Sequence, residues 1–116
     1  MKHHKSYRTL GRDKDQRKAL MRSLARSLFL HGKIVTTEPK AKEVRPFAEK
    51  LMTKAISGTP ANKRLIEASI GKGKVADMLV ETIAPKYKGR NGGYTRIIKM
   101  PTRVSDRAKM STIELV

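Results

Sequence analysis

Hydrophobic side chains recur every three to four residues over much of this chain, a spacing that places them on one face of an α-helix. The first such stretch runs from Asp13 to Leu30, and its apolar face carries Leu20, Met21, Leu24 and Leu28. Asp13 and Gln16 have the spacing of a capping box, and Gly32 is placed to end a helix in the left-handed conformation. The pattern therefore predicts a helix that starts at Lys14 and stops before Gly32.

The same spacing predicts three further helices in the middle of the chain. They are expected over residues 38–57, 59–70 and 74–84. Pro46 lies inside the first of these, where it removes a hydrogen bond and is expected to kink or split the helix. Pro85 is expected to stop the last one, because a proline cannot continue a helix without strain.

Short runs rich in β-branched residues predict the strands. Lys33 to Thr37 is one run, Tyr94 to Met100 is a second, and Met110 to Val116 is a third. The last two should pair as a hairpin across the polar, basic loop 101–109, and Lys33 to Thr37 can extend their sheet. The expected fold is α+β, with about four helices packed on a small sheet of two to three strands.

Charge changes how the first helix is interpreted. Lys14, Lys18, Arg22 and Arg26 follow one another at intervals of four residues. Like charges at this spacing each cost roughly 0.2–0.5 kcal/mol, so the row is either a solvated basic face or a surface that meets a polyanion. The chain has 27 Lys and Arg against 10 Asp and Glu, a formal net charge of +17 over 116 residues. So large an excess of positive charge repels itself unless anions surround it, so we favour the interpretation that the row meets a polyanion. Neutralising the row should leave the fold stable, because it relieves the like-charge pairs.

The charge is concentrated towards the two ends. Residues 1–26 hold nine basic and two acidic side chains, residues 86–109 hold eight and one, and the stretch between holds ten and six. Residues 1–12 have little to bury and are expected to form a flexible arm that folds on a partner, followed by one domain over residues 13–116. The candidate contacts in the arm are Lys2, His3, His4, Lys5, Arg8 and Arg12. Adjacent histidines alone are weak support for a metal site, so contact with phosphate or base is the preferred reading.

A second candidate site lies in the Gly-rich, basic stretch from Pro85 to Gly93. Consecutive glycines just before a strand suggest a tight turn with positive φ, or a backbone that approaches a ligand closely. The candidate contacts are Lys86, Lys88, Arg90, Gly92, Gly93, Tyr94 and Arg96, in addition to Lys18, Arg22 and Arg26 on the first helix. Tyr94 could either stack on a base or pack in the core, and the glycines could serve the turn alone.

Several classes of function find little support. The chain has no Cys and three His, and its acidic residues form no pair suited to acid–base catalysis, so an enzyme is not expected. Glu38, Glu43 and Glu49 lie among lysines and are interpreted as surface charge balance. Gly71-Lys-Gly-Lys74 lacks the spacing of a phosphate-binding loop. With no signal peptide and no apolar run near the roughly 18 residues of a membrane span, a soluble intracellular protein is expected.

Among the binding functions, RNA fits best. The third and fourth helices imitate a helix-turn-helix, but Asp77 and Glu81 would bring carboxylates toward DNA phosphates; a non-specific nucleoid protein stays open. A membrane-surface role for the first helix would use apolar residues that the core needs. Basic arms, a cationic helix face and a Gly-rich loop together are typical of proteins that bind structured RNA within an assembly.

The residues also resemble a known family, the bacterial large-subunit ribosomal protein seventeen family, over essentially the whole chain. The matching segments are Met1-Lys-His-His-Lys-Ser6, Leu10-Gly-Arg12, Arg17-Lys-Ala-Leu20, Leu24-Ala-Arg-Ser-Leu28, His31-Gly-Lys-Ile34, Thr36-Thr37, Lys40-Ala-Lys-Glu-Val-Arg45, Gly92-Gly-Tyr-Thr-Arg-Ile97 and Ile113-Glu-Leu-Val116. Residues 58–74 match loosely, and Gln16 stands where the family usually has His.

The resemblance implies an α+β structural constituent of the large ribosomal subunit in the bacterial cytoplasm. It implies binding to folded large-subunit (23S) ribosomal RNA near the peptide exit, beside neighbouring ribosomal proteins. It implies no catalysis, no cofactor, no small-molecule substrate and no membrane insertion.

Overall fold

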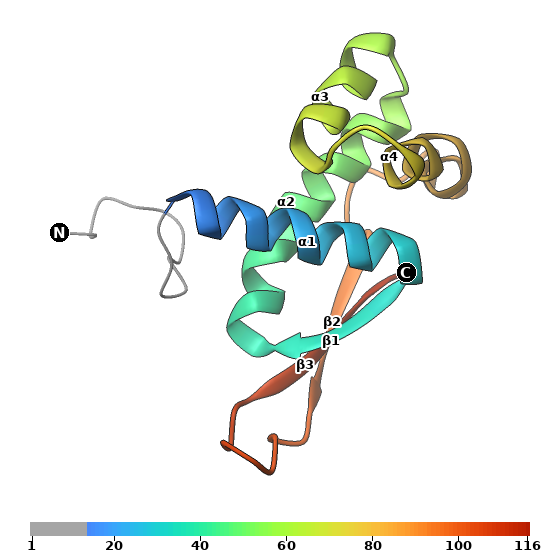
Figure 1. Ribbon diagram of the computed structural model, residues 1–116. Helices are drawn as coiled ribbons and strands as arrows, with labels where there is room; N and C mark the ends of the chain where they lie inside the picture. Colours follow the sequence, from blue (N-terminus) through green and yellow to red (C-terminus); the bar gives the residue numbers. More distant parts are fainter. Residues whose placement is uncertain (1–13) are drawn as a thin grey trace, which may run out of the picture.

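The computed structural model describes residues 14–116, in which four α-helices pack against one small sheet (Figure 1). The expected α+β class is confirmed. The helices are α1 (Lys14–His31), α2 (Glu38–Ser57), α3 (Pro60–Ile70) and α4 (Lys74–Met78), and the strands are β1 (Lys33–Thr37), β2 (Thr95–Met100) and β3 (Met110–Leu115). The proposed arm, residues 1–12, and the capping residue Asp13 lie outside the described residues.

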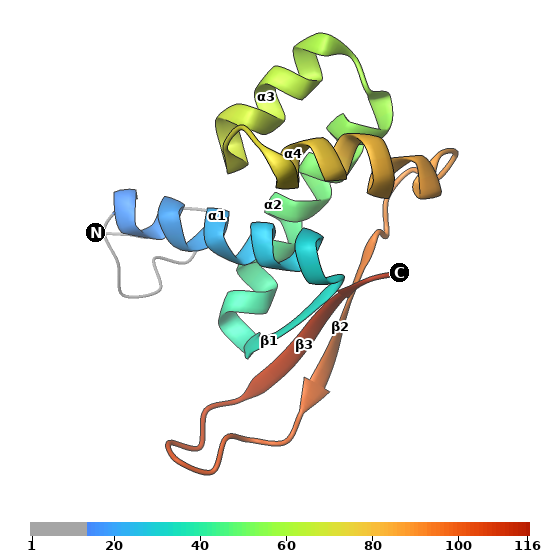
Figure 2. The same cartoon turned by 45° about the vertical axis from the view of Figure 1, so that its right-hand side comes forward.

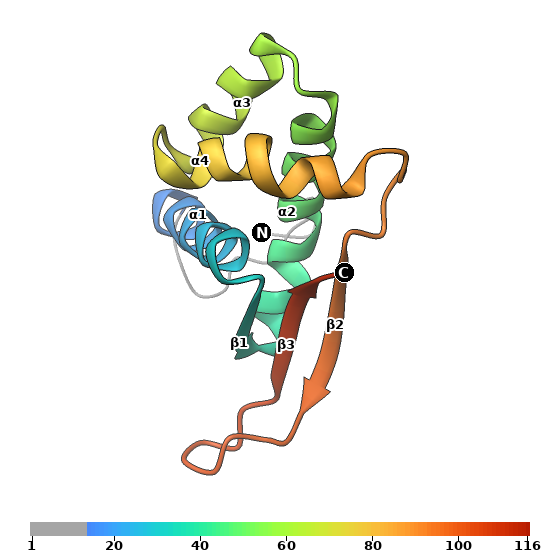
Figure 3. The same cartoon turned by 90° about the vertical axis from the view of Figure 1, so that its right-hand side faces the viewer.

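All three strands are antiparallel, and β3 lies in the middle, in the order β1-β3-β2. The predicted hairpin of β2 and β3 is confirmed, and β1 extends it along the free edge of β3. Ile34, Ile113 and Ile97 face one another across the three strands, with Ile113 fully buried. This row turns toward the helices and ties the sheet to the core. Figure 3 shows the strands in front of α2, with no helix over the side that faces the viewer.

Local signals set most of the helix ends where the sequence predicted them. The Thr59 side chain accepts a hydrogen bond from the Asn62 amide at 3.1 Å and caps the start of α3. Gly58 ends α2 in the left-handed conformation, with φ of 68°, and its amide donates to the Lys54 carbonyl. None of the helices in residues 14–116 combines the length and apolar character needed to cross a membrane.

The structure contradicts two expectations about prolines, a split of α2 at Pro46 and a stop of the last helix at Pro85. Helix α2 runs unbroken from Glu38 to Ser57, so Pro46 does not split it. Pro46 is exposed, and the carbonyl that loses its partner can turn to water at modest cost. Pro85 does not stop the last helix either. The chain continues as a π-helical turn over Leu79–Ile83 and a 3₁₀ turn over Ala84–Tyr87, and Pro85 fits the first turn of the latter because no amide is needed there.

The core is built mainly from helix side chains, and it corrects the predicted face of α1. Met21, Ala25, Leu28 and Phe29 are the buried residues of α1, whereas Leu20 and Leu24 are only partly buried. The buried stripe is therefore rotated toward Phe29, because α1 packs against both α2 and the end of α3. The largest fully buried side chains elsewhere are Leu51, Met52, Ile66, Ile70, Leu79, Tyr94 and Ile113.

Candidate nucleic-acid interface

The four basic residues spaced along α1 form two pairs with different contacts, Lys14 with Lys18 and Arg22 with Arg26. All four side chains are exposed. Within residues 14–116, Lys14 and Lys18 have no ion-pair or hydrogen-bond partner for their ammonium groups, so both can meet an external anion. Arg22 and Arg26 instead point along the helix toward the end of α3, where both donate hydrogen bonds.

Arg22 and Arg26 neutralise the C-terminus of α3. Arg22 Nε lies 3.1 Å from the Ser69 carbonyl oxygen, and Arg26 Nη1 lies 2.7 Å from that of Ile70. A helix C-terminus carries partial negative charge and unpaired carbonyls, and α3 has no basic residue in its own last turn. The two arginines of α1 supply that charge from a distant part of the sequence. They therefore have a structural role that the row's spacing alone did not reveal.

This role changes the expected effect of neutralising the row. Replacing Arg26 with Gln should lower the free energy of unfolding by about 1–2 kcal/mol, because a charge-assisted bond to a partly buried carbonyl is lost. Lys18→Gln is the matched control on the same helix and should change stability by less than about 0.5 kcal/mol. Urea unfolding followed by circular dichroism measures both. Equal, small effects from the two substitutions would mean that Arg26 does not stabilise α3.

Grooves open on both sides of Arg22. One has a volume of about 430 Å³ and the other about 300 Å³. The first is lined by Ala19, Arg22, Ser23, Arg26, Ser27, Leu30 and Val75, and the second by Arg17, Lys18, Met21, Arg22, Phe47, Ala68 and Ser69. Basic and hydroxyl side chains thus border concave surfaces along α1. Such a surface can seat a sugar–phosphate backbone, with the arginines held in place by their bonds to α3.

The Gly-rich loop has the backbone that its sequence predicted. Gly92 and Gly93 have φ of 136° and 66°, values that disfavour other residues. A Cβ added at either position would meet no atom within 4 Å. The glycines are therefore required by the turn's conformation and not by close packing against the chain itself. The space around them remains open to an external group.

Arg90 fastens this loop to the end of β3. Its Nη1 donates to the Val116 main-chain oxygen at 2.9 Å and to the Gly93 carbonyl at 3.3 Å, and its guanidinium lies 5.1 Å from the centroid of the Tyr87 ring. Lys86 and Lys88, by contrast, are exposed and have no such partner among residues 14–116. In this loop the lysines are the groups most available to phosphate.

Tyr94 packs in the core, which is one of the two roles that the sequence left open for it. Its side chain is 2% exposed, its hydroxyl donates to the Arg90 carbonyl at 3.0 Å, and its ring meets Tyr87 edge-on at 5.9 Å between centroids. Tyr94 therefore belongs to the core and cannot stack on a base in this conformation. Arg96 is also engaged, because its Nε donates to Glu114 Oε1 at 2.8 Å across the sheet.

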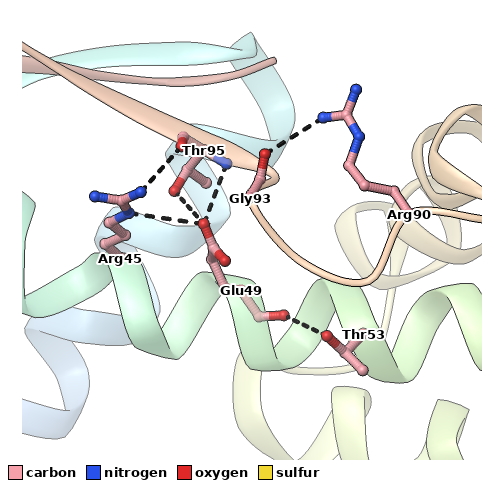
Figure 4. A network of polar contacts seen from close by, with 6 residues as sticks. All are labelled: Arg45, Glu49, Thr53, Arg90, Gly93 and Thr95. Carbon is pink, nitrogen blue, oxygen red and sulfur yellow. Dashed lines mark hydrogen bonds and ion pairs between the residues drawn. The ribbon is translucent and has the colours of Figure 1, made fainter.

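Glu49 corrects the interpretation of the acidic residues of α2. Its Oε2 accepts hydrogen bonds from the Thr95 amide at 3.2 Å and from the Thr95 hydroxyl at 2.7 Å, and Arg45 lies beside it (Figure 4). Glu49 thus joins α2 to the start of β2. The i, i+4 spacing could have predicted its pairing with Arg45 but not the bonds to Thr95, 46 positions away. Glu38 does balance surface charge as expected, because its Oε1 lies 2.7 Å from Lys42 Nζ.

The tip of the hairpin is a further basic region that the candidate residues did not include. Lys99, Arg107 and Lys109 have exposed side chains there that form no hydrogen bond and no ion pair within 4 Å in residues 14–116. Lys99 and Lys109 do lie near Glu38, because after the Lys42 hydrogen bond their charges also help to lower the pKa of that carboxyl. Arg103 is paired with Asp106, and this hydrogen-bonded pair lowers the pKa of Asp106 to about 2. The spacing of charges in residues 99–109 was visible in the sequence, but the absence of helix or strand periodicity gave no reason to single these side chains out.

Metal binding gains no support from the part of the chain that the structure describes, where no three His, Asp or Glu side chains gather. The histidine pair His3–His4 and the other candidate contacts of the arm lie outside the described residues. What the described residues offer is a set of unpaired cations at separate places, namely the start of α1, the Gly-rich loop and the hairpin tip.

Comparison with known proteins identifies the family of the chain. The profile of the family described as "Ribosomal protein L17" matches residues 20–116. The "Large ribosomal subunit protein bL17" of Dictyoglomus thermophilum is 50% identical over 116 residues, which cover 100% of both chains. Proteins of the same description from Gemmatimonas aurantiaca and Campylobacter concisus are 49% and 47% identical over the whole of this chain and 98% of theirs. The chain therefore belongs to the Ribosomal protein L17 family.

Proposed function

We propose that this chain is a structural constituent of the bacterial large ribosomal subunit and that it binds and stabilises folded large-subunit (23S) RNA. The observation that supports the ribosomal role most directly is its similarity, over the full chain, to proteins described as large ribosomal subunit proteins. The family is structural and not enzymatic, which agrees with the lack of catalytic residues in the sequence. We place the protein in the cytoplasm, where bacterial ribosomes are located.

The distribution of unpaired cations supports RNA as the ligand. The start of α1, the Gly-rich loop and the hairpin tip lie at different ends of the molecule (Figure 2), whose extents are 43 × 32 × 25 Å. A single straight duplex can follow only one side of such a body. A folded RNA can surround it and supply phosphate on several sides at once, with the basic arm of residues 1–12 adding a further contact.

The structure of the fourth helix argues against a groove-reading DNA protein. A recognition helix must enter the major groove and present several side chains to the bases. Helix α4 is regular over only Lys74–Met78 before it widens into a π-helical turn. Asp77, the fourth of its five residues, is turned toward α3, where its Oδ1 lies 3.3 Å from Lys63 Nζ. Neighbouring ribosomal proteins near the peptide exit are the further partners that we propose.

Sedimentation tests this function. The native protein should travel with large subunits through a sucrose gradient and leave them only at high salt, because phosphate contacts weaken as counterions compete. A protein that stays at the top of the gradient in low salt would not be a subunit component.

A binding comparison separates RNA from DNA. The purified chain should bind large-subunit RNA at least tenfold more tightly than random duplex DNA at the same salt concentration, because several separated cationic surfaces require a folded ligand. Filter binding or fluorescence anisotropy measures the two affinities. Equal or tighter binding to the duplex would favour a nucleoid protein instead.

A further inference from the structure

The hairpin tip, which comprises residues 99–109, projects away from the helices. Figures 1 to 3 show its loop extending from the sheet at the bottom of each view. Every residue of the tip except Ala108 is exposed. A loop in this position contributes little to the core, so its residues can serve a contact outside the chain.

The tip is held in one shape by its own hydrogen bonds. Arg103 Nε and Nη2 donate to the two carboxylate oxygens of Asp106 at 2.9 and 2.7 Å, and Asp106 Oδ1 also accepts from the Ala108 amide at 3.1 Å. Main-chain bonds run from the Arg103 amide to the Ala108 carbonyl at 2.9 Å and from the Arg107 amide to the Arg103 carbonyl at 2.7 Å. A loop that is already ordered loses less conformational entropy when it binds.

Arg107 has a backbone conformation that few residues with a side chain adopt. Its φ is 58°, and it is the one non-glycine residue with positive φ among residues 14–116. Gly or Asn would adopt this conformation at lower cost. The guanidinium is exposed and forms no hydrogen bond and no ion pair within 4 Å in that part of the chain. A strained position that carries a cation without a partner in the fold indicates a partner outside it.

Val104 lies at the outermost turn of the tip. Its side chain is 97% exposed, the highest value among the large hydrophobic residues of the described chain. The hydrogen bonds of Arg103 and Arg107 fix the backbone on both sides of it. A fixed apolar side chain between two arginines can enter a ligand while the cations bind around it, as apolar wedges do in nucleic-acid complexes.

Charge and shape together favour RNA as the ligand of the tip. Residues 99–109 hold four basic side chains and one acidic side chain, and the acidic one, Asp106, is already paired with Arg103. A nucleic-acid strand supplies one anionic phosphate and one apolar base face with every nucleotide. The tip presents the same two kinds of surface side by side, with Val104 next to the cations.

Within a folded RNA, Val104 is better suited to an unstacked base than to a duplex. Bases inside an A-form duplex cover one another's faces, and the open minor groove presents polar 2′-hydroxyls, against which a valine gains little. A bulge or loop exposes the face of a base, and an apolar side chain that covers this face removes apolar surface from water.

We propose that the hairpin tip is a preformed RNA-reading element. Val104 packs against the face of an unstacked base in a bulge or loop of the large-subunit RNA, and Arg107 binds a neighbouring phosphate. Asp106 is a positioning residue, because it holds Arg103 and the turn in place without touching the RNA. This inference rests on the proposed function and names the kind of RNA segment that this part of the protein takes.

Two substitutions separate the apolar contact from the ionic contact. Val104→Ser should weaken binding to large-subunit RNA about fivefold and leave its salt dependence unchanged, because no counterion is involved. Arg107→Asn keeps the left-handed backbone and should weaken binding about tenfold near 0.1 M salt, with a salt slope shallower by about one. Filter binding at several salt concentrations measures both. Leu65→Ser and Arg64→Gln, at exposed positions of α3, are the matched controls and should have much smaller effects.

Asp106 gives a test in which charge and preorganisation predict opposite results. Asp106→Ala removes a negative charge, which by itself should tighten binding to a polyanion. If the tip must be preformed, the same substitution should instead weaken binding about threefold, because the loop has to be ordered on the RNA. Asp77→Ala, which breaks the exposed pair with Lys63, is the matched control and should not weaken binding. Equal urea midpoints of the two variants verify that neither unfolds the domain.

Directed hydroxyl-radical cleavage locates the RNA that the tip contacts. The chain has no Cys, so Thr102→Cys accepts a single iron–EDTA probe beside the turn. The cleaved nucleotides should include some that are reactive to 2′-hydroxyl acylation in the free RNA and therefore unpaired. The wild-type protein should change their reactivity, and Val104→Ser should not. Ser57→Cys at the end of α2 is the control position and should cleave a different segment.

The outcomes distinguish this inference from the proposed function. Wild-type protein that does not bind large-subunit RNA would overturn the proposed function. If the wild type binds but the Val104 and Arg107 variants behave like the α3 controls, the tip is not an RNA contact. Tip variants that bind RNA normally but fail to enter large subunits would assign the tip to a protein partner and overturn the inference. Cleavage confined to continuous duplex would overturn the unstacked base, and equal binding by the two Asp variants would overturn the role of Asp106.

Discussion

Replacing Lys14, Lys18, Lys86 and Lys88 with Gln should lower the affinity for large-subunit RNA by on the order of a thousandfold near 0.1 M salt, because each phosphate contact releases about one counterion and is worth roughly tenfold there. The estimate allows for one of the four lysines making no contact. None of them has an ion-pair partner among the described residues, so the free energy of unfolding should change little. Filter binding at several salt concentrations should show a slope of log affinity against log salt that is shallower by about three.

A second fourfold variant provides the control. Lys40, Lys50 and Lys54 on α2 and Arg64 on α3 also become Gln, which removes the same charge from surfaces that we do not place against RNA. This control should lose much less affinity. If the two variants lose affinity equally, binding reflects total charge, and the start of α1 and the Gly-rich loop are not contact sites.

Tyr94→Ala should lower the free energy of unfolding by about 3–5 kcal/mol, the usual cost of removing a large buried aromatic ring. The ring is nearly fully buried and packs against Tyr87, so its loss leaves a cavity between the Gly-rich loop and α2. Tyr94→Phe keeps the ring and removes only the hydroxyl that donates to the Arg90 carbonyl, at a cost of about 1 kcal/mol. Urea unfolding followed by circular dichroism measures both changes.

RNA binding by the Tyr94→Phe variant separates the two roles that the sequence left open. If Tyr94 acts only in the core, the Tyr94→Phe variant should bind RNA with unchanged affinity, because the hydroxyl is turned inward. A large loss of affinity together with unchanged stability would mean that Tyr94 reaches RNA after a rearrangement of the loop. A fully stable Ala variant would show that the ring does not support the core.

Sequence reasoning succeeded where a local signal decides the outcome. The ends of α1, α2 and α3 follow from Gly32, Gly58 and the Thr59 cap, because capping bonds form between residues three to five positions apart. The strands follow from β-branched runs, and positive φ at Gly92 and Gly93 follows from the pair of glycines. The expected split at Pro46 and the expected stop at Pro85 did not occur, because the cost of a proline depends on whether nearby carbonyls can find water or a new helical turn.

The basic residues of the candidate site show what the local sequence pattern could not predict, namely which of them are bonded within the fold. Lys18, Arg22 and Arg26 look equivalent along α1, yet only the two arginines reach the carbonyls of α3. Arg90 looks as available as Lys88, yet it is bonded to the end of β3. These differences depend on partners 26 to 47 positions away along the chain, and no periodicity within one element can encode them.

For this protein, the sequence by itself determined the element order, the α+β class, the excess of positive charge and the resemblance to a ribosomal family. It could do so because propensity and capping act over a few residues, and composition acts over the whole chain at once. The tertiary structure alone decided which basic side chains stabilise the fold and which remain available to RNA. It also decided that Glu49 joins α2 to β2 and that no helix of residues 14–116 covers one face of the sheet. These properties arise from contacts between distant segments, which exist only after the core has packed.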